Sequence, residues 1–102
     1  MPNSRAVACC LLNISEARNA VVVERIARAA VAHQLNASPI QTSVLNVFRD
    51  QDYNRSVITL ASTDTAALKR AVVDACTVGE LFWEIVCTGL NLIYFEGGKV
   101  FS

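Results

Sequence analysis

The order and spacing of apolar residues constrain the fold of this chain more than any other feature. Residues 19–35 and 63–78 each carry apolar side chains at the i, i+3, i+4 and i+7 spacing of an amphipathic helix. Three shorter apolar runs have the length and composition of β-strands, and they span residues 6–14, 42–49 and 56–62. The short polar connection between the last two runs favours an antiparallel hairpin. The predicted order is therefore strand, helix, strand, strand, helix.

A closing strand after the second helix would complete a βαββαβ unit. Residues 84–102 hold the candidate strand, EIVCTGLNLIYF, which is followed by a Glu-Gly-Gly-Lys turn. With that strand paired, we expect an α+β, ferredoxin-like two-layer sandwich, in which both helices cover one face of an antiparallel sheet. Without it, strand edges and apolar surface would stay exposed, and dimerisation or aggregation would follow.

Local patterns place particular residues within these elements. The first helix has Asn19 as its predicted N-cap, and its apolar stripe consists of Val23, Ile26, Ala27, Ala30 and Val31. The second helix begins at Thr63 or Asp64, since both residues are good caps. In the second strand, alternation places Val44, Asn46 and Phe48 on one face, and Leu45 and Val47 on the other.

Composition and charge narrow the possible partners. A chain of 102 residues with 53% hydrophobic and 18% charged residues fits one folded domain. The formal net charge is zero, no cluster of Lys and Arg occurs, and Phe48 is the one aromatic candidate on the central strands. Neither nucleic acid nor an anionic membrane is therefore an expected partner. The sequence shows no secretory signal and no apolar run of the ~20 residues that span a bilayer, so we expect a cytoplasmic protein.

Metal and thiol chemistry have little support in the sequence. The four cysteines are Cys9, Cys10, Cys76 and Cys87, and no Cys-x-x-Cys spacing of a zinc site occurs. We expect four reduced thiols in or near the core. The one histidine, His33, lies late in the first predicted helix with no Cys or carboxylate beside it, so no metal ligand or catalytic base is expected there.

Two polar clusters are the candidates for a functional site. Asn13, Ser15 and Glu16 follow the first strand, and the hairpin carries Asp50, Asp52, Asn54 and Arg55. We expect the end of the first strand and the hairpin at opposite ends of the sheet, so the clusters need not form one pocket. Two interpretations stay open. In the first, Ser15 and Asn13 cap turns, the turn geometry explains the Asp and Asn residues of the hairpin, and Arg55 pairs with Asp50 or Asp52 in water. In the second, Arg55 binds a small molecule that bears a carboxylate.

The same segments resemble a known family. NISEARN at residues 13–19, followed by the amphipathic helix, resembles the opening of the formiminotransferase N-terminal subdomain, and NRSV in DQDYNRSV resembles its next strand pair. The resemblance divides the chain into a subdomain-like part, residues 1–83, and a divergent tail, residues 84–102. It implies that tetrahydrofolate binds in a groove between this subdomain and a second, similar one. The residues that it points to for ligand binding are Asn13, Ser15, Glu16, Asn54 and Arg55.

Departures from the family pattern bear on catalysis. The family has Pro and Gly where this chain has Leu12 and Ala17, and acidic residues where it has Asn46 and Phe48. The segment that carries the family's catalytic His after the second helix has no counterpart, and neither has the second subdomain. We therefore expect a folate-binding domain from a truncated product that is not catalytic on its own. The alternative is a non-catalytic interaction or dimerisation domain, acting through a sheet edge or face, that has lost the folate chemistry.

Overall fold

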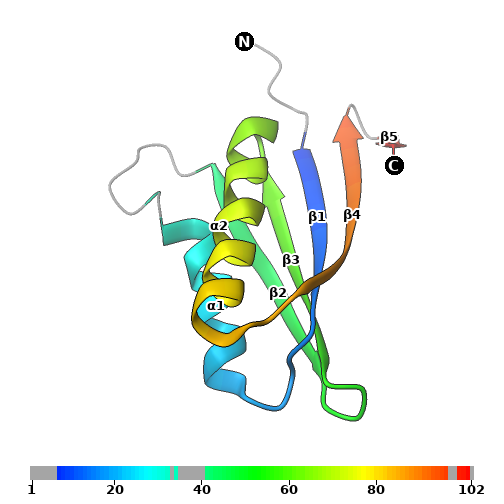
Figure 1. Ribbon diagram of the computed structural model, residues 1–102. Helices are drawn as coiled ribbons and strands as arrows, with labels where there is room; N and C mark the ends of the chain where they lie inside the picture. The colour runs from blue at the N-terminus through cyan, green and yellow to red at the C-terminus, as the bar shows by residue number, and fades with distance from the viewer. Residues whose placement is uncertain (1–6, 33, 35–40, 97–98, 102) are drawn as a thin grey trace.

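The computed structural model describes residues 7–32, 34, 41–96 and 99–101. Two helices, α1 (Ala20–Ala32) and α2 (Thr65–Trp83), lie together on one face of an antiparallel sheet (Figure 1). The sheet order is β2-β3-β1-β4-β5. Its strands are β1 (Val7–Ile14), β2 (Thr42–Asp50), β3 (Arg55–Ser62), β4 (Cys87–Glu96) and β5 (Lys99–Phe101). The predicted ferredoxin-like βαββαβ order is confirmed, with β4 as the closing strand and the short β5 added beyond it.

Alternation along the two central strands creates the two faces of the sheet. In β1 and β3 every second side chain is buried, which is the period of a strand with one covered face. The covered positions, among them Leu12, Ile58 and Leu60, pack against Val23 and Ile26 of α1. The intervening side chains point to the opposite face, which no described helix covers. We call this second face the open face.

The ends of the helices follow local hydrogen bonds. Asn19 caps α1 as predicted, because its Oδ1 accepts the Val22 N–H at 3.3 Å. α1 ends at Ala32, earlier than residue 35, and Gln34 uses its side chain to bind both the N–H and the C=O of Thr42. The predicted Asp64 cap of α2 is confirmed.

α2 continues past its predicted end near residue 78. It stops at Trp83, where Glu84 adopts the left-handed conformation with φ 54°. Gly79, inside the helix, packs against Ile26 at a distance that leaves little room for a Cβ. The buried contact holds this last part of α2 in place, although the sequence pattern alone did not require it.

A bulge in β2 makes one predicted face assignment wrong. Val44 pairs with Leu60 and Asn46 pairs with Thr59, so the register shifts at Leu45. As a result Val44 packs against the core, whereas Asn46 and Phe48 lie on the open face. Strict alternation had placed all three side chains on one face.

The prediction of four reduced thiols is also wrong. Cys76 of α2 and Cys87 of β4 form a disulfide, with their Cα atoms 6.0 Å apart. The turn after α2 brings β4 back beside the helix, which places the two residues together. Cys9 and Cys10 are free, as expected. The predictions about His33 lie outside the described residues.

Candidate functional site

The loop between β1 and α1 lies against the β2–β3 hairpin. Ile14 at the end of β1 pairs with Ser56 at the start of β3, because the two strands are antiparallel neighbours. The end of β1 therefore lies at the hairpin end of the sheet. The expectation that the two polar clusters lie at opposite ends is wrong, since β3 and not β2 is the neighbour of β1.

Asn54 joins the two segments through its side chain. Its Oδ1 accepts the backbone N–H of Ala17 at 2.8 Å and that of Arg18 at 3.1 Å. Its backbone is left-handed, with φ 53°, a conformation that Asn tolerates better than most residues. Nearby, the Ser56 hydroxyl donates to the Glu16 carbonyl. The side-chain oxygen of Asn54 thus holds the loop to the hairpin.

Two arginines that the sequence analysis did not select reinforce this junction. The Arg18 side chain donates from Nε to the Gln51 carbonyl at 3.0 Å and from Nη2 to the Asp52 carbonyl at 3.4 Å. Arg49 donates from Nη1 to the Ala17 carbonyl at 2.9 Å. Both arginines donate to backbone carbonyls that lie far away in the sequence, so no local sequence pattern indicates these partners.

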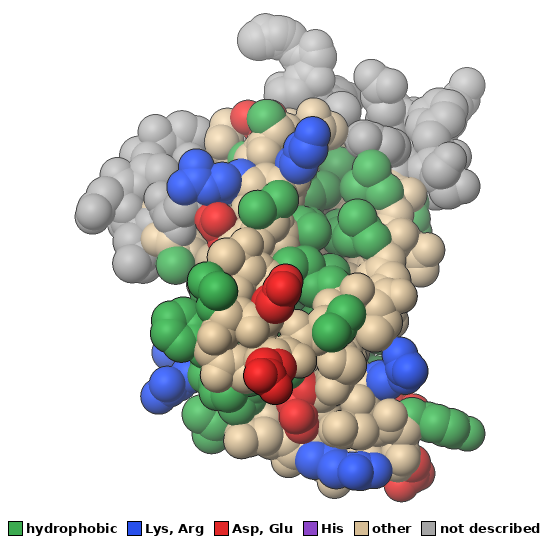
Figure 2. All heavy atoms as spheres, in the orientation of Figure 1, with side chains coloured by type: hydrophobic (Ala, Val, Ile, Leu, Met, Phe, Trp, Pro, Cys, Tyr) green, Lys and Arg blue, Asp and Glu red, His purple; other side chains and the backbone are tan. Residues whose placement is uncertain are grey.

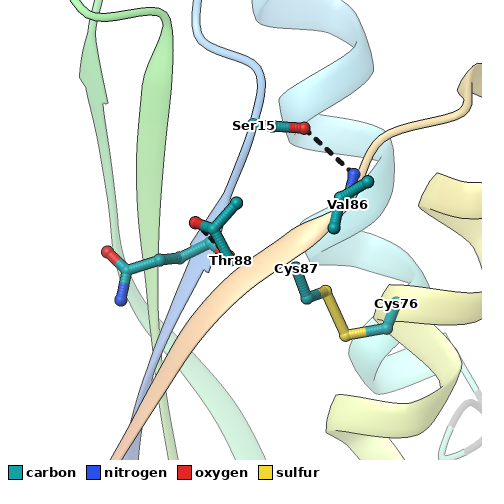
Figure 3. Close-up of a disulfide and its surroundings, with 6 residues drawn as sticks. Ser15, Cys76, Val86, Cys87 and Thr88 are labelled. Atoms are coloured by element: carbon teal, nitrogen blue, oxygen red, sulfur yellow. Dashed lines mark hydrogen bonds between the residues drawn. A yellow bond between two sulfur atoms is a disulfide. The ribbon is translucent and has the colours of Figure 1, made fainter.

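Ser15 and Glu16 are also committed to the backbone. The Ser15 hydroxyl accepts the Val86 N–H at 3.0 Å, and the Ser15 N–H donates to the Val86 carbonyl at 3.0 Å, which ties the end of β1 to the start of β4 (Figure 3). Glu16 Oε2 accepts the N–H groups of Arg18 and Asn19 at 2.9 and 3.0 Å. A carboxylate close to the N-terminus of α1 interacts favourably with the positive end of the helix dipole.

Asn13 and Arg55 are the two predicted residues whose side chains remain available. Within the described parts of the chain neither side chain makes a hydrogen bond, and Arg55 forms no ion pair with Asp50 or Asp52. Asp50 Oδ1 instead accepts the N–H groups of Asp52 and Tyr53 and so caps the turn, as one interpretation predicted. Arg55, the first residue of β3, is exposed and pairs with Asp50 across the hairpin.

The available side chains share the open face. Asn13 pairs with Val57, and Arg55 stands two residues before Val57 along the same strand, so the two positions are diagonal neighbours roughly 7–8 Å apart. On the other side of Val57 lies Phe48, which is 57% exposed. Gly89 pairs with Asn13, and a Cβ there would come within 3.3 Å of the Asn13 amide nitrogen.

This arrangement suits binding better than proton transfer. It offers one cation, one amide and an aromatic ring on the open face, and Gly89 adds no side chain next to the amide. Among the residues that the structure describes, no three His, Cys, Asp or Glu side chains gather as a metal site. No described helix is long and apolar enough to cross a membrane.

A comparison with protein families identifies the family of this chain. The sequence model of the family described as formiminotransferase domain, N-terminal subdomain, matches residues 7–80. The matched range runs from the first residue of β1 to near the end of α2, and it includes the whole junction between loop and hairpin. The chain therefore belongs to the formiminotransferase N-terminal subdomain family, a family of folate-related transferase domains.

Proposed function

We propose that this domain binds a reduced folate on the hairpin end of the open face, and that it does not transfer a formimino group by itself. The observation that carries this proposal is Arg55, an exposed cation that leaves its guanidinium donors unused by the described residues. Guanidinium groups bind carboxylates in bidentate fashion, and folates carry glutamate carboxylates. The family match supports folate as the ligand class.

The neighbouring side chains suit the remaining parts of a folate. Phe48 presents an exposed ring on which a flat pterin can stack. Asn13 offers both an amide donor and an acceptor, and Gly89 leaves room beside its amide nitrogen because it has no side chain. In this proposal Arg55 and Asn13 contact the ligand directly. Ser15, Glu16 and Asn54 act as positioning residues, since their side chains already bind the backbone.

The chemistry of the same face argues against catalysis by this chain alone. Where the family pattern has acidic residues, this chain has Asn46 and Phe48, and neither an amide nor a phenyl group can act as a general acid or base near neutral pH. Loss of a positioned acid or base costs roughly 10²–10⁴ in rate. The groove that a second subdomain would complete also supplies the positioning of two reactants.

We expect the domain to act in the cytoplasm.

Calorimetric titration with tetrahydrofolate tests the proposal. We expect Arg55→Ala to weaken binding about 10- to 100-fold, because a hydrogen bond to a charged group contributes about 1.5–3 kcal/mol. The matched control is Arg28→Ala, which removes an exposed arginine from α1 that pairs with Glu24. Equal affinities of the Arg55→Ala variant and the parent would refute the site. Failure of the parent to bind would refute the proposed function.

The second function that we propose is self-association through the edge of the sheet. β2 pairs with β3 on one side, and its exposed apolar side chains include Leu45, 60% accessible at the bulge, and Val47. A second copy could pair with this strand in antiparallel fashion and extend the sheet. Sedimentation at increasing concentration would show a dimer that Leu45→Lys abolishes. A monomer at all concentrations would rule this function out.

A further inference from the structure

The Cys76–Cys87 disulfide joins the helical layer to the sheet. Cys76 comes from α2 and Cys87 is the first residue of β4, eleven positions later. In Figure 3 the bond runs from the helix directly to the start of the strand. Among the described residues, β4 also pairs with β1 and β5 within the sheet.

Beyond the disulfide, α2 and β4 stand apart across a groove. Two hollows of about 600 and 220 Å³ lie between them, and they share Val72 of α2 and Leu90 of β4. Cys10 and Leu12 of β1 line the hollows from the sheet side. Figure 2 shows apolar side chains gathered in this region. The disulfide closes one end of the groove, so it spans a place where the two elements do not pack directly.

The disulfide is open to small molecules. Both cysteines are half-buried, and both line the smaller hollow of the groove. They also line a separate hollow of about 550 Å³, together with Glu80 and Glu84. A thiolate must reach one sulfur in order to exchange. Hollows that both cysteines line provide that access.

We propose that Cys76 and Cys87 form a reversible redox site, whose reduction by a small dithiol releases β4 from α2. A thiolate of the dithiol attacks one sulfur, the Cys76–Cys87 bond breaks, and a mixed disulfide forms. The second thiol of the reagent then displaces the remaining cysteine. The protein gains two electrons and two protons, as the Cys76 and Cys87 thiols, and the dithiol leaves as a cyclic disulfide.

Reduction should loosen this end of the molecule without unfolding it. The turn keeps the hydrogen bond from the Ile85 N–H to the Gly79 carbonyl, and Ile85 stays in the core. The two bonds between Ser15 and Val86 also remain. Reduction removes only the cross-link over the groove. α2 and β4 can then separate at this point and expose Cys10, which lines the groove from the sheet side.

Alkylation of the native full chain, read residue by residue in a mass spectrometer, tests the site. Air-oxidised protein should label at Cys9, which is free and half-buried on the open face, and leave Cys76 and Cys87 unlabelled. After treatment with dithiothreitol at neutral pH, Cys76 and Cys87 should label within minutes, and labelling of Cys10 should rise about tenfold. The melting temperature should fall by about 10 °C.

Variants separate the role of the disulfide from a general effect of thiols. The double variant Cys76→Ser, Cys87→Ser should melt at the temperature of the reduced parent and should not respond to dithiothreitol. Cys9→Ser, the matched control, should keep the full response. Labelling of Cys76 and Cys87 in the air-oxidised protein would overturn the proposal. Resistance of the disulfide to dithiothreitol until the protein is denatured would also overturn it.

Discussion

Replacement of Asn54 by alanine isolates the contact that joins the hairpin to the loop after β1. The substitution removes the acceptor for the Ala17 and Arg18 N–H groups. The Arg18 N–H keeps a second acceptor, Glu16 Oε2 at 2.9 Å. Ala17 is fully buried, so its N–H loses its partner and has no access to water.

The expected destabilisation has two parts. An unpaired buried donor costs about 1–3 kcal/mol. The left-handed backbone at this position, φ 53°, costs alanine about 1 kcal/mol more than asparagine. Asn54→Ala should therefore lower the free energy of unfolding by about 2–4 kcal/mol. Asn54→Gly should recover the backbone part, and Asn54→Asp, which keeps an acceptor oxygen, should stay within about 1 kcal/mol of the parent.

Urea denaturation of the three variants, followed by circular dichroism, measures these differences under a two-state analysis. The expected order of stability is parent, aspartate, glycine, alanine. An alanine variant within about 0.5 kcal/mol of the parent would refute the structural role given to Asn54. Weaker folate binding at unchanged stability would assign the residue to the ligand instead.

Three further changes test other parts of the structure. Asp64→Ala should lower the free energy of unfolding by about 1 kcal/mol in urea, because the carboxylate accepts the Ala66 N–H at 2.9 Å and caps α2. Leu12→Ala should cost about 2–5 kcal/mol in the same assay, since the side chain is 1% exposed in the centre of the core; a smaller loss would place Leu12 outside it. Burial, with a smaller contribution from the neighbouring Cys9, raises the pKa of Cys10 from 9.0 to about 11. The folded chain then keeps a proton that the unfolded chain releases, so stability from this group is complete below about pH 9 and is lost as the pH rises toward about 11. Urea midpoints at about pH 8 and pH 10 should show a smaller alkaline loss in Cys10→Ala than in the parent, and an equal loss would contradict the assignment.

Features that depend on neighbouring residues could be predicted from the sequence. The stripe of α1 was predicted correctly at Val23 and Ile26, and the caps at Asn19 and Asp64 followed from side chains that bind backbone groups two or three residues away. The ligand-binding site remains a prediction. Asn13 and Arg55 were selected together with three residues whose side chains hold the backbone, because a polar residue at a turn looks the same in either role.

The sequence alone determined the order of the elements and the residues of α1 that face the sheet, because the 3.6-residue period of a helix is a local property of the chain. Only the tertiary structure decided that β3 lies between β1 and β2, which brings Asn54 to Ala17, and that the turn after α2 brings Cys87 to Cys76. These contacts join residues far apart along the chain. They depend on which strands pair when the whole core is buried, and no local sequence pattern determines that pairing.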